Sequence, residues 1–107
     1  MTIETLQQYI AMRRPVIVLI QAWKDDDDPI PYPDNFENGH YVVAIGYDAL
    51  NIYFEDPWIH GSLTYMRKAD LLDRWHGNTD EPVDRRIYRS GIIVNEPLVE
   101  SENVIYL

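Results

Sequence analysis

The fold is decided by the segment Gly39-His40-Tyr41-Val42-Val43-Ala44-Ile45-Gly46-Tyr47-Asp48 and by Asn51-Ile52-Tyr53-Phe54-Glu55-Asp56-Pro57, which follows it. Both segments are rich in aromatic and β-branched residues, which favour strands. The connection from Asp48 to Leu50 is short and is flanked by Asp and Asn, as in a tight turn. We therefore predict a hairpin that brings the two strands side by side.

Before this hairpin the sequence predicts one helix and one central strand. Thr2 can cap the helix, and Pro15 ends it. The run 16–20 is continuous and mostly β-branched, which indicates a strand covered on both faces that continues through 21–23. The apolar face of the helix is formed by Ile3, Leu6, Tyr9 and Ile10.

After the hairpin the pattern predicts further short strands and a second helix. Leu71, Leu72 and Trp75 lie at core spacing in that helix, and Gly77 ends it. The expected elements are a strand over 62–66, the helix over 68–76, a loop over 78–84, a strand over 88–95 and a last edge strand over 103–107. This order predicts an α+β domain with a twisted, mainly antiparallel sheet and two helices.

A long acidic segment at 24–38 interrupts the pattern. It is rich in aspartate and proline and has no apolar periodicity, so we expect a surface loop. Loops of this length inside compact domains are uncommon and are usually functional or mobile. Because the loop ends directly at Gly39 and His40, one hypothesis is that it acts as a flap over a site there.

Length, charge and composition limit the classes of protein. With 107 residues the chain is expected to form a single domain over 1–107, and its aromatic content of 12% indicates a globular fold. The net charge of -9 makes nucleic acid and anionic lipid poor partners. The sequence has neither a signal pattern nor an apolar run long enough to span a membrane, so we expect a soluble, cytoplasmic protein without membrane insertion. The absence of cysteine removes disulfides, thiolate zinc sites and thiol catalysis by this chain.

His40 and Asp56 are the candidate site residues. His40 opens the first strand of the hairpin and Asp56 closes the second, so their side chains can come within hydrogen-bonding reach. An acid in that position fixes the tautomer of an imidazole and stabilises an imidazolium. The alternative is that His40 is an ordinary strand-end histidine and that Asp56 caps a turn before Pro57.

Several motifs resemble one known family, the papain-like bacteriocin-processing cysteine peptidases. These are the double-glycine leader peptidases, found in ABC transporters and in stand-alone bacterial relatives. The motifs are Pro15-Val16-Ile17-Val18, the segment His40 to Asp48, Ile52-Tyr53-Phe54-Glu55-Asp56-Pro57, Leu71-Leu72 with Arg74-Trp75-His76, and Gly91-Ile92-Ile93-Val94.

The resemblance implies that His40 is the general base and that Asp56 orients it. It covers only the carboxyl-terminal, sheet-rich half of a papain-like fold. The helical half of the family carries a glutamine for the oxyanion hole and the nucleophilic cysteine, and neither has a counterpart here. Without a nucleophile and an oxyanion donor, the chain alone is not expected to cleave peptides.

Other residues give weaker indications of a site. Gln21 is a candidate oxyanion donor, but a hydrogen-bonded structural amide is the simpler interpretation. The run Asp25–Asp28 lacks the ligand spacing of a calcium loop and is better explained as a solvated loop.

His60 and His76 form no close metal-binding pair, and His76 is expected at a helix end, where it would compensate the dipole. Ser62, Ser90 and Ser101 lack a nucleophile elbow. We expect no metal and no cofactor.

Two main functional hypotheses follow, and each implies different partners. In the first, the chain is a fragment or split half of a leader-peptidase-like enzyme, and a second chain or a longer parent supplies the missing half. In the second, it is a non-enzymatic module that binds peptides or oligomerises. A third, a hydrolase using His40, Asp56 and a bound metal, has less support. The expected partners are a peptide or protein substrate, a chain bearing the cysteine, and a second copy of this chain, because half of a papain-like fold exposes an apolar face.

Overall fold

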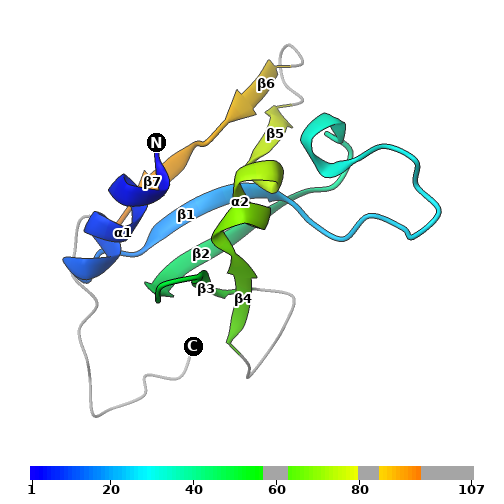
Figure 1. Cartoon of the computed structure of the whole chain (residues 1–107). Helices are drawn as coiled ribbons and strands as arrows, with labels where there is room; N and C mark the ends of the chain where they lie inside the picture. Colours follow the sequence, from blue (N-terminus) through cyan, green and yellow to red (C-terminus); the bar gives the residue numbers. More distant parts are fainter. Residues whose placement is uncertain (57–62, 80–84, 95–107) are drawn as a thin grey trace, which may run out of the picture.

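The computed structural model describes residues 1–56, 63–79 and 85–94, and these form an α+β structure (Figure 1). Five of the described strands make one antiparallel sheet in the order β4-β3-β2-β1-β7, and β5 and β6 pair separately. The predicted fold class is therefore confirmed. The elements are α1 (Ile3–Ala11), β1 (Val16–Gln21), the 3-10 helix η1 (Tyr32–Asp34), β2 (Gly39–Tyr47), β3 (Asn51–Glu55), β4 (Thr64–Arg67), α2 (Lys68–Arg74), β5 (His76–Thr79), β6 (Arg85–Tyr88) and β7 (Gly91–Ile93). The strand expected over 103–107 lies outside the described residues.

Helix α1 begins at the predicted cap, but it ends at Ala11, before the predicted stop at Pro15. The backbone N–H of Thr5 donates to Oγ1 of Thr2, which confirms Thr2 as the N-cap. The helix ends at Ala11, and Arg13 follows with a left-handed φ of 60°. No helix in the described parts of the chain is long and apolar enough to cross a bilayer.

Strand β1 lies inside the sheet, as predicted, between β2 and β7. Its register with β2 places Val16 opposite Ala44 and Ile20 opposite His40. The β2–β3 hairpin is also confirmed: Oδ1 of Asp48 accepts hydrogen bonds from the backbone N–H groups of Leu50 and Asn51, which fixes the turn.

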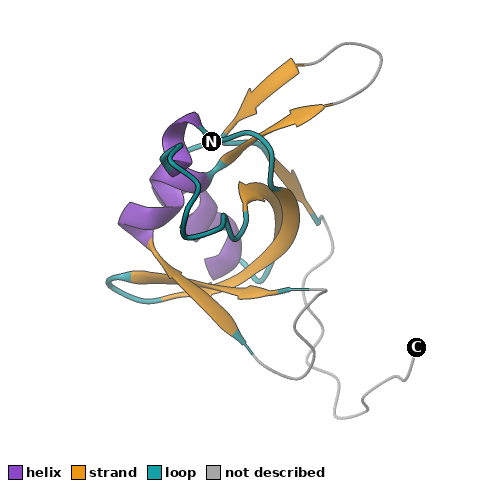
Figure 2. Cartoon of the chain, turned by 90° about the vertical axis from the view of Figure 1, so that its right-hand side faces the viewer, coloured by secondary structure: helices purple, strands orange, loops and turns teal. Residues whose placement is uncertain are grey.

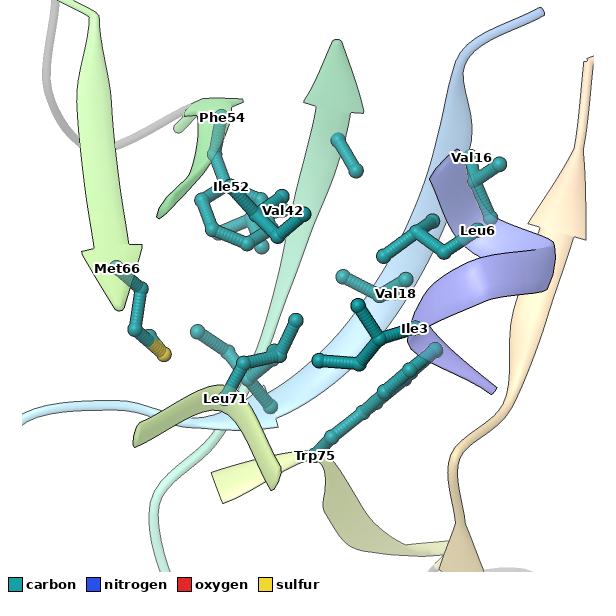
Figure 3. Packing of buried hydrophobic residues seen from close by; sticks show 12 residues of the cluster. Ile3, Leu6, Val16, Val18, Val42, Ile52, Phe54, Met66, Leu71 and Trp75 are labelled. Carbon is teal, nitrogen blue, oxygen red and sulfur yellow. The ribbon is translucent and has the colours of Figure 1, made fainter. Parts of the chain in front are cut away.

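The two helices pack against the sheet and close a single hydrophobic core (Figure 3). Leu6 of α1 and Leu71 of α2 are fully buried, and Trp75 lies directly after α2 with 1% of its surface exposed. The indole Nε1 of Trp75 donates a 2.8 Å hydrogen bond to the carbonyl oxygen of Ser90, so its polar atom is paired. The strand residues of the core are Val16, Val18, Ile20, Val42, Ala44, Ile52, Phe54 and Met66.

The region after α2 differs from the prediction. The helix expected over 68–76 ends at Arg74, and His76 begins β5, which pairs with β6 and projects beyond the larger sheet (Figure 2). Gly77 therefore does not end the helix. It lies under Leu19 of β1, where a Cβ at position 77 would be 2.4 Å from Cδ2 of Leu19. The conformation of this segment is determined by packing against β1, which is far away in the sequence. The local pattern of apolar residues does not show that packing.

The strand expected over 88–95 is two strands. Strand β6 ends at Tyr88, and β7 begins at Gly91 in the other sheet. Arg89 lies between them with a left-handed φ of 50°, and its backbone N–H donates to the carbonyl oxygen of Trp75. This kink lets the chain leave its pairing with β5 and pair with β1, on the side of β1 opposite β2. A pattern of apolar residues does not reveal such a change of partner strand.

Candidate functional site

The hairpin brings His40 and Asp56 together. Val43 of β2 pairs with Glu55 of β3, so the start of β2 and the residue after β3 lie at the same end of the hairpin. Nε2 of His40 is 2.7 Å from Oδ1 of Asp56, and the side chains are 11% and 5% exposed. The predicted hydrogen-bonding reach between these residues is therefore confirmed.

This contact determines what each nitrogen of the imidazole can do. An ionised carboxylate only accepts hydrogen bonds, so the proton between the two groups belongs to Nε2 of His40. In the neutral ring the lone pair is then on Nδ1. The ring of Trp23 lies beside the imidazole, with the centroids 5.4 Å apart. With an ionised Asp56 as the acceptor, this contact favours the tautomer that carries its proton on Nε2.

The pair lies in the wall of a cavity of about 330 Å³. The deeper walls are apolar and belong to the core face of the sheet, whereas the rim carries large exposed side chains: Trp23 is 58%, Leu63 64% and Tyr65 67% exposed. Arg74 adds a positive charge. The lining residues are Ile20, Ala22, Trp23, His40, Val42, Phe54, Asp56, Leu63, Thr64, Tyr65, Met66 and Arg74.

Gln21 is a structural amide, as the simpler interpretation predicted. The side chain is fully buried. Its Nε2 donates to the carbonyl oxygen of His76, and its Oε1 accepts from the backbone N–H of Asn38. Both ends of the amide thus join β1 to neighbouring segments.

The 24–38 loop packs on α2 and β5 and contributes no side chain to the walls of this cavity. The carbonyl oxygen of Asn35 is 2.6 Å from Nε2 of His76, and the ring of Tyr32 lies against Arg74. In this arrangement the loop contacts Arg74, a residue of the cavity wall, and the hypothesis of a flap gains no support. The carboxylate of Asp28 accepts hydrogen bonds from the backbone of Ile30 and from the Asn35 amide, which shapes the loop itself.

His76 does not have the predicted role of compensating a helix dipole. Because α2 has already ended, His76 is the first residue of β5, and it is only 4% exposed. Its ring packs 4.4 Å from that of Phe36, centroid to centroid. His60 lies outside the described residues, and within the described ranges no three His, Cys, Asp or Glu side chains cluster as metal ligands would.

Arg74 is a site residue that the sequence did not reveal as one. It is half-buried in the last turn of α2. Its Nε donates a 2.8 Å hydrogen bond to the carbonyl oxygen of Gln21, and the guanidinium carbon is 4.4 Å from the centroid of the Tyr32 ring. Burial lowers the pKa of the Arg74 guanidinium, while Tyr32 and Asp70 act in the opposite direction. Two features of the sequence could have indicated it: its position three residues after Leu71, on the core side of the helix, and its place in the family-like motif with Trp75 and His76.

A family model described as the Peptidase_C39 like family matches residues 1–82, and the chain belongs to this family. This membership indicates a cysteine-peptidase-like domain. None of the curated proteins and none of the solved structures compared with the chain matches it.

Proposed function

We propose that this chain supplies the general-base half of a cysteine-peptidase site of the bacteriocin-processing type. His40 is the base, Asp56 orients it, and a second polypeptide segment supplies the thiol and the oxyanion donor. The observation that carries this proposal is the 2.7 Å contact between Nε2 of His40 and Oδ1 of Asp56 in the wall of the cavity.

The chemistry follows from the two ring nitrogens. A thiol placed at Nδ1 of His40 transfers its proton to the ring, and the thiolate attacks the carbonyl carbon of the peptide. The carboxylate of Asp56 stabilises the resulting imidazolium through Nε2–H. The imidazolium then gives its proton to the leaving amine as the C–N bond breaks, and water hydrolyses the thioester that remains.

The chain on its own is a pseudoenzyme under this proposal. Its 107 residues contain no cysteine, so no thiolate is available at Nδ1. A bound water is a far weaker nucleophile, and no oxyanion donor is assigned among the described residues of the cavity wall. Peptides are therefore expected to bind to the isolated chain without being cleaved.

The test begins with the coding DNA immediately upstream of the Met1 codon and with the adjacent genes, which identify a candidate cysteine-bearing half. The two halves are then expressed together and assayed for peptide cleavage. His40→Ala should lower kcat/KM by several orders of magnitude, as loss of the base does in such triads. Tyr41→Phe is the matched control, because Tyr41 is adjacent in β2, is 54% exposed and points to the other face.

Two results would contradict the proposal. One is cleavage by the isolated chain, and the other is a reconstituted complex whose rate is unchanged by His40→Ala. Alkylation of thiols should abolish the activity of the complex and leave the isolated chain unmodified, because the latter has no cysteine.

The exposed rim of the cavity favours a second candidate function, a module that binds peptides without cutting them or that pairs with a second copy of itself. Trp23, Leu63 and Tyr65 are large, mostly exposed side chains around an apolar cavity, as in many binding surfaces. If binding is the whole function, His40→Ala leaves the affinity for the partner nearly unchanged. Sedimentation of the chain over a concentration series tests whether the rim makes a homodimer.

A further inference from the structure

The guanidinium of Arg74 is held in a fixed orientation at the cavity wall. One hydrogen bond, from Nε to the carbonyl oxygen of Gln21, and the stack on the Tyr32 ring set this orientation. Neither contact uses the two terminal nitrogens, which carry the paired donors that match a carboxylate. Arg74 lines the cavity, and within the described residues its side-chain hydrogen bond leaves these paired donors unused.

Among the described residues Asp70 acts on the charge of Arg74 through space, no carboxylate forms a direct ion pair with its guanidinium, and the carboxylate of Asp56 is engaged with His40. A half-buried cation without a carboxylate in direct contact is unfavourable, because its lost hydration is only partly replaced by a carbonyl oxygen, a ring face and the more distant charge of Asp70. An anion that enters the cavity would supply the missing interaction. The whole chain has a net charge of -9, so its overall electrostatic potential repels anions. Attraction of an anion into the cavity therefore depends on the local charge of Arg74.

We propose that the cavity binds a carboxylate of a peptide and that the terminal nitrogens of Arg74 are its receptor. Arginine binds carboxylates through two parallel N–H···O bonds, which gives geometric selectivity as well as affinity. The apolar walls formed by Ile20, Val42 and Phe54 accommodate the side chain next to that carboxylate. This inference rests on the proposed function only in taking the ligand to be a peptide.

The test uses the isolated chain and matched peptides in a calorimetric titration. N-acetyl-Ala-Leu-Ala with a free carboxyl terminus should bind at least about tenfold more tightly than its amide, since charge-assisted pairs exceed neutral ones by that order. A second pair, amidated N-acetyl-Ala-Glu-Ala and its Gln counterpart, separates a side-chain carboxylate from a terminal one. Equal affinities within both pairs, or no binding of any of the four peptides, would overturn the proposal.

A variant assigns the preference to Arg74. Arg74→Gln should abolish the difference between acid and amide, and Arg74→Lys should keep part of it, because the charge remains while the paired donors are lost. Arg67→Gln is the control, since it makes the same change in net charge at an exposed position outside the cavity. An unchanged acid preference in a folded Arg74→Gln protein contradicts the assignment. If Arg74→Gln does not fold, the four peptides on the unaltered chain still decide whether a carboxylate is recognised.

The outcome is separable from that of the proposed function. Binding is measured without a thiol and without cleavage, so the failure of a reconstituted peptidase would leave a carboxylate preference intact. Conversely, an active complex that binds acid and amide equally well would retain the role of His40 and exclude the role of Arg74.

Discussion

Leu19 of β1 occupies the space that a side chain at position 77 would need. A Cβ on Gly77 would lie 2.4 Å from Cδ2 and 2.6 Å from Cγ of Leu19, and Leu19 is itself buried. Gly77→Ala should therefore lower the free energy of unfolding by about 1–3 kcal/mol through overpacking. Urea denaturation followed by tryptophan fluorescence measures this change.

Gly39 provides a matched control at the same leucine. A Cβ there would be 3.6 Å from Cδ1 of Leu19, which is ordinary van der Waals contact. Gly39→Ala should change stability by less than about 1 kcal/mol. If both variants lose the same free energy of unfolding, the close approach of Leu19 to position 77 is not the cause of the loss.

The two tryptophans described by the structure should differ strongly in their contribution to stability. Trp75 is 1% exposed and donates to the carbonyl oxygen of Ser90, whereas Trp23 is 58% exposed. Trp75→Phe removes buried volume and leaves that carbonyl without its donor, so we expect a loss of about 2–4 kcal/mol. Trp23→Phe should cost less than about 0.5 kcal/mol. Thermal unfolding of both variants checks this order, and a larger loss for Trp23→Phe would refute it.

Asp48 and Tyr53 should titrate as a pair. The hydroxyl of Tyr53 donates to Oδ2 of Asp48, and this bond is the largest cause that lowers the pKa of the Asp48 carboxyl and raises the pKa of the Tyr53 phenol. The lowered pKa of Asp48 stabilises the fold above the unfolded pKa of the carboxyl, and this contribution is lost as the pH falls through the folded pKa. The raised pKa of Tyr53 stabilises the fold below the unfolded pKa of the phenol, and that contribution is lost as the pH rises through the folded pKa.

Carbon-detected NMR titration of the Asp48 carboxyl tests this coupling. Tyr53→Phe should move the pKa of Asp48 upward toward its ordinary value, although the backbone hydrogen bonds from Leu50 and Asn51 keep part of the shift. Tyr65→Phe, on the neighbouring strand, is the control and should leave the pKa of Asp48 unchanged. No movement in Tyr53→Phe would mean that the backbone alone sets the pKa.

The central elements could be predicted because their sequence pattern and their tertiary environment agree. The apolar face of α1, the β-branched run of β1 and the β2–β3 turn each have a local signature, and the hairpin length alone brings His40 close to Asp56. Strand β5 was missed because its conformation depends on contacts between distant segments, such as that of His76 with Asn35. Arg74 was missed for the same reason, since its partners Gln21 and Tyr32 are far from it in sequence.

Gln21 offers the last prediction, which separates a structural amide from a site residue. Gln21→Met keeps a similar shape but leaves the N–H of Asn38 and the carbonyl oxygen of His76 without partners, so we expect a loss of about 2–4 kcal/mol in the free energy of unfolding. The acid preference of the matched peptides should persist below the unfolding transition, because the amide does not line the cavity. Calorimetric titration at low temperature, together with urea denaturation, measures both quantities. A stable Gln21→Met protein that no longer binds peptide would instead place the amide of Gln21 in the binding site.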